Sequence, residues 1–179
     1  MGNGYGLKPD QFKFPQGIFI EAKTQIMYVA DVSNNRVQKR YPNGEIKTAA
    51  GQSNGDAGSS AEKLNGPKDV FADENENVYI ADWSNQRIQL WKKDAQSGET
   101  VAGDGTAGSS LSEFQYPSQI ILNSKKNPIV ADYQNQRITQ WPATYVPKTS
   151  IGTLIAVRFA SDICSTDCSS SSRVEMEQV

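Results

Sequence analysis

Short apolar runs, separated by polar stretches that contain glycine, recur along this chain of 179 residues. Three of the runs end in Ala-Asp and continue as Asp-x-x-Asn-x-Arg, and these copies lie about 50 residues apart. Similarity at such a period indicates stacked repeats, in which no single unit buries its own apolar faces. The nine recurring residues are Asp31, Asn34, Arg36, Asp82, Asn85, Arg87, Asp132, Asn135 and Arg137.

Each repeat predicts four β-strands. A proline leads into an apolar stretch that forms the first strand, and β-branched and aromatic residues bounded by Asn, Gly and Pro form the second and third. The unit is therefore a four-stranded antiparallel meander, which matches one propeller blade and predicts an all-β fold. Fourth strands are expected in residues 45–49, 99–102 and 148–156.

The Asp-x-x-Asn-x-Arg segment is expected to form the hairpin between the second and third strands. Asn and Ser tolerate left-handed backbone geometry, which suits the tip of that turn. The Asp and Arg side chains can pair across the hairpin or cap nearby amides. We expect a structural role for all nine residues, because a catalytic residue has no reason to be copied into every blade.

Residues 77–89 (Asn-Val-Tyr-Ile-Ala-Asp-Trp-Ser-Asn-Gln-Arg-Ile-Gln) and the opening Pro67-Lys68-Asp69-Val70 resemble the NHL repeat. The resemblance extends over about residues 2–150. It implies a β-propeller, commonly of six blades, that serves mostly as a binding module. NHL propellers also occur in ubiquitin ligases with RING and B-box domains, in bacterial receptor kinases, in RNA-binding proteins and as the peptide-amidating lyase.

The composition argues against most enzymatic members of that family. The chain has no histidine and two cysteines, whereas zinc sites rely on Cys, His and carboxylate ligands. We therefore expect no catalytic residue, no metal and no cofactor. Residues 103–108 satisfy G-x-G-x-x-G, but no helix is expected to follow, and similar glycines recur before each blade. We interpret this loop as an inter-blade connector whose glycines have positive φ.

The repeats divide the chain into five segments. Because three blades do not close a ring, we expect an incomplete propeller, either part of a larger protein, which we favour, or a half-ring that associates with a second copy. Cys164 and Cys168 are expected to be idle thiols or a local disulfide. The segments are an inter-blade loop remnant (1–13), blades at 14–63, 64–113 and 114–156, and a Ser-rich, disordered tail (157–179).

A partner surface is expected where the hairpins and the inter-blade connectors emerge on the same face of the blades. Positions there that vary between repeats are candidates for specificity. Trp83 and Tyr133 are the sharpest, because aromatic side chains anchor interfaces, although they can instead pack between blades. The candidate partner-binding residues are Gln16, Val32, Lys68, Trp83, Gln86, Ser118 and Tyr133.

These features predict a non-catalytic binding or scaffold module that docks a protein or peptide. The alternative is RNA binding through Lys68 and the aromatic residues, and a propeller hydrolase or lyase ranks third. The net charge of −2 and the scattered basic residues do not indicate a nucleic-acid binder. No apolar run approaches the length of a bilayer-spanning helix, so no membrane insertion is expected. The sequence leaves the localisation open.

Overall fold

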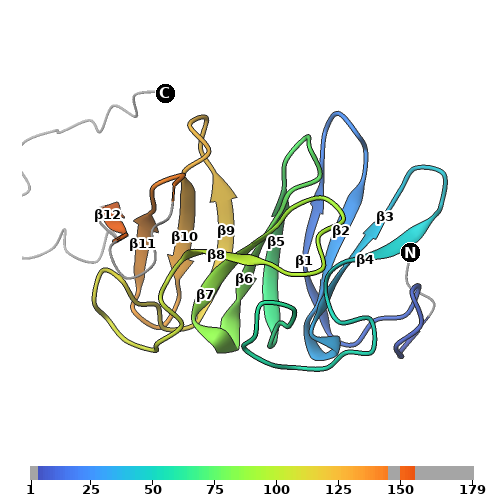
Figure 1. The fold of residues 1–179 in the computed structure, drawn as a ribbon, viewed down its shortest axis with the longest axis horizontal. Coiled ribbons are helices and arrows are strands. Elements are labelled where there is room, and N and C mark those ends of the chain that lie inside the picture. The colour runs from blue at the N-terminus through green and yellow to red at the C-terminus, as the bar shows by residue number, and fades with distance from the viewer. Residues whose placement is uncertain (1–3, 145–149, 156–179) are drawn as a thin grey trace, which may run out of the picture.

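The computed structural model describes residues 4–144 and 150–155, and within them the fold is all-β, as the sequence predicts (Figure 1). The strands form three four-stranded antiparallel sheets, which we call the first, second and third blades. The first blade contains β1 (Pro15–Ile20), β2 (Met27–Asp31), β3 (Arg36–Arg40) and β4 (Ile46–Gly51). The second contains β5 (Pro67–Ala72), β6 (Val78–Asp82), β7 (Arg87–Trp91) and β8 (Glu99–Ala102). The third contains β9 (Pro117–Leu122), β10 (Pro128–Asp132), β11 (Arg137–Gln140) and β12 (Thr153–Ile155).

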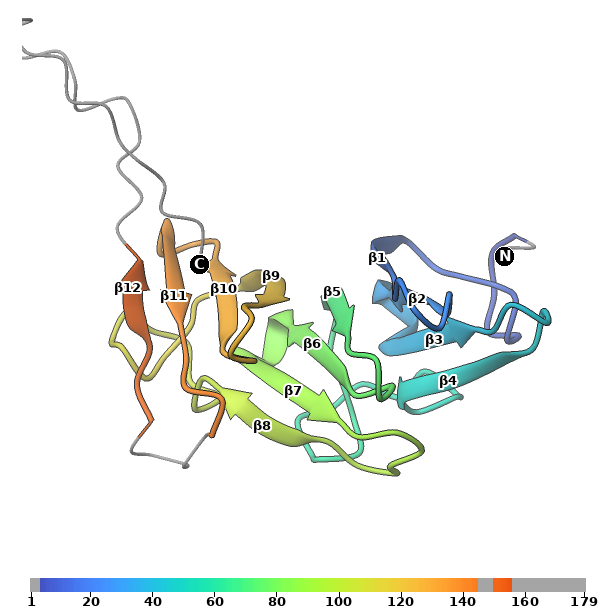
Figure 2. The same ribbon diagram turned by 90° about the horizontal axis from the view of Figure 1, so that it is seen from above.

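In every blade the strands are ordered as they occur in the chain, so each blade is a simple meander. Viewed from above, the blades stand side by side in an open arc with the second in the middle (Figure 2). The predicted incomplete ring is therefore confirmed for the described part of the chain. Short 3-10 turns, Val32–Asn34 and Trp83–Asn85, connect the second and third strands of the first two blades.

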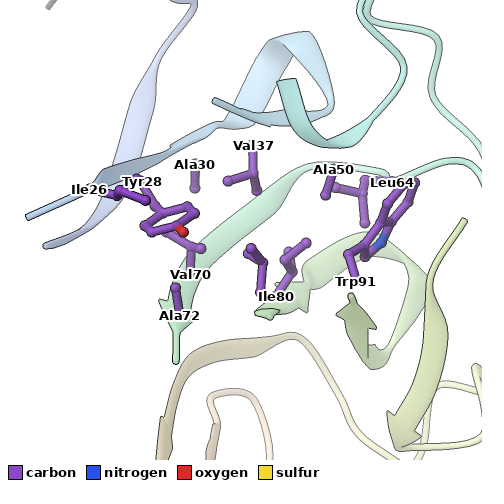
Figure 3. Packing of buried hydrophobic residues seen from close by; sticks show 11 residues of the cluster. Ile26, Tyr28, Ala30, Val37, Ala50, Leu64, Val70, Ala72, Ile80 and Trp91 are labelled. Atoms are coloured by element: carbon purple, nitrogen blue, oxygen red, sulfur yellow. The ribbon is translucent and has the colours of Figure 1, made fainter. Parts of the chain in front are cut away.

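The first two blades pack face to face. Tyr28, Ala30 and Val37 of the first blade point toward Val70 and Ile80 of the second (Figure 3). Every one of these side chains is almost completely buried. Successive side chains along a strand point to opposite faces of the sheet. The residues between those named here therefore face away from this contact and can pack against another blade.

The second blade uses its other face for the third blade. Ala81 and Ile88 pack in one cluster with Ile120, Val130 and Trp141. Because both faces of the second blade are covered, its strands are the most completely buried in the arc. The first and third blades each have one such neighbour within the described chain.

A buried polar contact also joins the first two blades. Glu76, in the turn between β5 and β6, accepts hydrogen bonds from Lys39 and Tyr41 of the first blade, each at 2.9 Å. Its other oxygen lies 2.6 Å from the ammonium of Lys93. Burial raises the pKa of Glu76, but the hydrogen bonds from Lys93, Lys39 and Tyr41 outweigh it and bring the value to about 2.

The three glycine-rich connectors share one closing contact. An isolated bridge closes each loop, as between Ala107 and Phe114. Gly103 and Gly105 have the predicted positive φ, of 76° and 87°. Gly108 is outside the positive-φ region, which corrects the prediction for that position. An added Cβ there would instead collide with the side chain of Glu113.

Two predictions fall outside the described residues. They are the disordered tail at 157–179 and the state of Cys164 and Cys168.

Candidate functional site

The recurring Asp, Asn and Arg residues form a buried clamp in each blade. In the second blade, the Asp82 carboxylate accepts hydrogen bonds from Asn85 Nδ2 at 2.8 Å and from Arg87 Nε at 2.9 Å. Its other oxygen accepts the main-chain amide of Asn65 at 2.8 Å. The carboxylate is fully buried, and charge-assisted hydrogen bonds of this kind are strong.

The remaining donors of the clamp hold the connector that leads into the same blade. Arg87 donates to the main-chain oxygens of Ser59, Ser60 and Lys63, at 2.8 to 3.0 Å. Asn85 donates to Gly58 O at 2.8 Å. A guanidinium has five donors in a rigid fork, which explains why arginine fits this position. The side chains are engaged with the protein's own main chain.

The same contacts recur in the other two blades. Arg36 donates to Leu7, Lys8, Gln11 and Ser53, and Arg137 donates to Ser109, Ser110 and Glu113, all through main-chain oxygens. The Arg Nε to carboxylate distance is 2.9 Å for Asp31 and 2.7 Å for Asp132. The repeat therefore fastens each hairpin to its connector on one side of the arc.

On that side, an aromatic cluster bridges the second and third blades. Trp83 stacks on Tyr116, with ring centroids 5.0 Å apart and planes at 25°. Tyr133 lies tilted against Trp83 at 5.6 Å, and the ammonium of Lys68 lies 4.9 Å from the centroid of the Trp83 ring. Tyr133 is 62% exposed and Tyr116 is 39% exposed. We call Lys68, Trp83, Tyr116 and Tyr133 the aromatic cluster.

The backbone beside Trp83 places Tyr116 in the cluster. Gln86, at the end of the second hairpin, has a left-handed φ of 54°, and its Oε1 accepts the Tyr116 amide at 2.6 Å. Tyr116 itself has a left-handed φ of 61° directly before Pro117. Gln86 is almost completely buried, so its contribution to the site is to position Tyr116.

A polar cleft of about 400 Å³ lies beside the cluster along the first strands. Gln16, Lys68 and Ser118, which occupy the position after the proline in each repeat, all line it. Lys68 belongs to both the cleft and the aromatic cluster. The structure thus brings together Lys68, Trp83 and Tyr133 in one cluster, and Gln16, Lys68 and Ser118 in one cleft.

Asp69 also lines this cleft. Its carboxylate accepts the Ile120 amide at 3.1 Å, which ties β5 to β9. Burial raises its pKa above the ordinary value, although hydrogen bonds from the Ile120 and Val70 amides act in the opposite direction.

Val32 is the remaining candidate. It is half-buried in the first hairpin, where Trp83 and Tyr133 stand in the other repeats, and it provides no ring. The aromatic surface is therefore specific to the contact between the second and third blades. Sequence reasoning missed Tyr116 and Asp69, although both positions vary between repeats and that variation could have indicated them. Phe14 and Gly66 replace Tyr116 in the other repeats, while Gly17 and Gln119 replace Asp69.

Two further observations concern residues 4–144 and 150–155. No group of three or more Cys, Asp or Glu side chains is placed to hold a metal ion in this part of the chain. None of its helices has the length and apolar character needed to cross a bilayer.

Comparison with known proteins places the fold but not the family. No family model matches the chain. The protein SUPPRESSOR OF QUENCHING 1, chloroplastic, from Arabidopsis thaliana is 36% identical over 99 residues, which cover 50% of this chain and 9% of that protein. The chain thus spans about a tenth of the length of this curated relative.

Two solved structures are similar in fold. An auxiliary nutrient binding protein from Bacteroides thetaiotaomicron superposes with a TM-score of 0.56 at 16% identity, over 68% of this chain and 35% of that one. A gluconolactonase from Xanthomonas campestris superposes with a TM-score of 0.55 at 13% identity, over 77% of this chain and 47% of that one. These are β-propeller-like proteins, so the three blades have a β-propeller-like fold.

Proposed function

We propose that this chain is a non-catalytic binding module of the NHL propeller type, which docks a protein or peptide on its loop face through the aromatic cluster. The observation that carries the proposal is the exposure of Tyr133 and Tyr116, which both contact the ring of Trp83. Exposed aromatic side chains beside polar groups are the usual anchors of protein interfaces.

The charge distribution favours a peptide over a nucleic acid. Three arginines that could contact phosphates, Arg36, Arg87 and Arg137, already donate to the protein's own main chain. Lys68 is the cation of the aromatic cluster, and its side chain is half-buried there. The net charge of the chain is −2, so its overall charge does not attract an anionic polymer over long distances.

A library of random dodecapeptides displayed on phage, selected against the immobilised chain, tests the proposal. We expect enriched peptides whose affinity falls at least tenfold in Trp83→Ala, because buried aromatic anchors dominate interface energies. Tyr5→Ala is the matched control, since Tyr5 is an exposed ring with a lysine 5.4 Å from its centroid at the other end of the arc. Failure to enrich any peptide, or equal loss in both variants, would contradict the proposal.

RNA binding is the second candidate, and one observation favours it. Lys68 lies beside stacked aromatic rings. Proteins that bind single-stranded nucleic acids use this combination, because the rings stack on bases and the cation neutralises phosphate. Fluorescence anisotropy with a labelled random-sequence RNA separates the two candidates. RNA affinity that falls steeply between 50 and 200 mM salt, and that depends on Lys68, would favour this candidate.

A further inference from the structure

Both contacts between blades inside the chain use the same pair of faces. The leading blade contributes the Ala before the recurring Asp and the apolar residue after the recurring Arg. The following blade contributes the apolar residue three positions after its proline and one from its second strand. At the first contact these residues are Ala30 and Val37 against Val70 and Ile80, and at the second they are Ala81 and Ile88 against Ile120 and Val130.

The third blade presents the leading face again, without a neighbour in the described chain. Ile129, Ala131 and Ile138 lie at the positions that pack in the other two blades, and together with Ile121 they line a hollow of about 280 Å³. Ile121 is 55% exposed. Its equivalents Phe19 and Phe71 are partly buried against the inter-blade clusters.

The first blade presents the following face at the opposite end of the arc. Ile18 is 62% exposed and Ile20 is 50% exposed. The residues equivalent to Ile18 in the other blades, Val70 and Ile120, are each 2% exposed because a neighbouring blade covers them. The two ends of the arc therefore carry the two halves of one interface, and exposed apolar patches of this kind mark association sites.

One of the two contacts inside the chain also contains a hydrogen bond between blades, and its positions recur at the two ends of the arc. The Asp69 carboxylate accepts the amide of Ile120 across the second contact. Gln119 occupies the Asp69 position in the third blade, and Ile18 occupies the Ile120 position in the first. The Gln119 amide oxygen of the third blade can therefore accept a hydrogen bond at the position where Asp69 does, whereas Gly17 at the first contact has no side-chain acceptor.

We propose that the outer face of the third blade docks onto the outer face of the first blade of a second copy, and that the reciprocal contact closes a six-bladed ring. Each copy supplies both halves of the seam, so the contact continues the packing already present twice within the chain. A two-fold axis relates the copies, and the two seams are equivalent. The second copy brings its own Gln16, Lys68 and Ser118, the residues that line the cleft in one copy, to the same ring.

The seam differs from the internal contacts at one position. Trp91 and Trp141 are buried at the internal contacts, whereas the first blade has Arg40 at the equivalent position, partly exposed. The seam therefore buries less apolar surface than the internal contacts, and the dimer is reversible. Arg40→Trp should strengthen association by at least fivefold, because it restores the aromatic side chain of the other contacts.

Sedimentation velocity of the 179-residue chain over a hundredfold range of concentration tests the proposal. We expect a species of twice the 19.6 kDa chain mass. Ile18→Asp and Ile121→Asp should each be monomeric, since each damages both seams. An equimolar mixture of the two variants should form a dimer again, because one seam in the mixed pair is intact. Leu111→Asp, at an exposed connector position, is the matched control and should leave the mass unchanged.

Several results would overturn the proposal. A wild-type chain that stays at the monomer mass while folded excludes the contact. A ladder of higher masses indicates head-to-tail growth without closure. Failure of the mixed variants to associate, or persistence of the dimer in either single variant, indicates contacts between like faces. Circular dichroism melting of each variant verifies that the blades themselves remain folded.

Discussion

Replacing Glu76 by glutamine removes the charge that joins the first two blades. In the wild-type chain, Glu76 accepts hydrogen bonds from Lys39 and Tyr41 at 2.9 Å and contacts Lys93 at 2.6 Å. Glu76 is 8% exposed, and Lys39 is also almost completely buried. The variant keeps the shape of the side chain but places an amide donor against a lysine, and it leaves the buried ammonium of Lys39 without this carboxylate.

The size of the effect follows from the pKa of Glu76. Burial raises this pKa, while hydrogen bonds from Lys93, Lys39 and Tyr41 lower it, from the ordinary 4.5 to about 2. At about 1.36 kcal/mol per unit, the shift corresponds to about 3 kcal/mol of stability at neutral pH. Asp94, 3.7 Å from Lys39, retains part of the compensation in the variant. We therefore expect Glu76→Gln to lower the free energy of unfolding by about 2 to 3 kcal/mol.

Urea unfolding at a series of pH values measures this loss. Because the pKa is lower in the folded chain, the unfolded chain takes up the proton first as the pH falls. The contribution is complete above about pH 4.5 and disappears as the pH falls toward about 2, so the two proteins should converge in stability over that range.

Glu74→Gln is the matched control for the Glu76 experiment. Glu74 pairs with Lys23 at the surface, where exposed ion pairs contribute about 0 to 1 kcal/mol. The account of the inter-blade contact would be refuted if the two variants lost equal stability. It would also be refuted if the Glu76→Gln difference did not change between pH 6 and 3.

Two other substitutions test the clamp and the connector. Arg87→Met leaves the fully buried Asp82 carboxylate without its cation and should lower the free energy of unfolding in urea by about 3 to 5 kcal/mol, whereas a loss below about 1 kcal/mol would contradict the clamp. Gly103→Ala should lower the melting temperature more than Gly105→Ala. Both positions have positive φ, but an added Cβ would lie 2.5 Å from Phe114 at the first and no closer than 3.8 Å to any atom at the second. Equal shifts would disprove the close approach.

The repeat pattern was sufficient to predict the meanders, because each strand, turn and hairpin depends on nearby residues. The left-handed φ of Asn35 at the first hairpin follows from the tolerance of Asn for this geometry. The repeat then predicts the same geometry for the equivalent Gln86, although its side chain is almost completely buried. The pairing of Asp82 with Arg87 also follows, since five residues across a hairpin mouth bring the two side chains together. These features are local, and one repeat reinforces the next.

Contacts between blades could not be predicted in the same way. Tyr116 stacks on Trp83 of another blade, and its own backbone has a left-handed φ directly before Pro117. The Glu76 contact with Lys39 joins residues 37 positions apart in different blades. Such pairs depend on how two sheets are placed against one another, which the spacing of one repeat does not specify.

The most direct test of the central claim is a nuclear Overhauser spectrum of the aromatic side chains. Phe19 and Phe71 join the first and second blades with ring centroids 4.6 Å apart, and Trp83 and Tyr133 join the second and third at 5.6 Å. If the blades stand side by side and gather the candidate site on one face, cross-peaks connect the rings within both pairs. If the spectra are assigned and the cross-peak of one or both pairs is missing, the arrangement of the blades is contradicted, and the candidate binding surface with it.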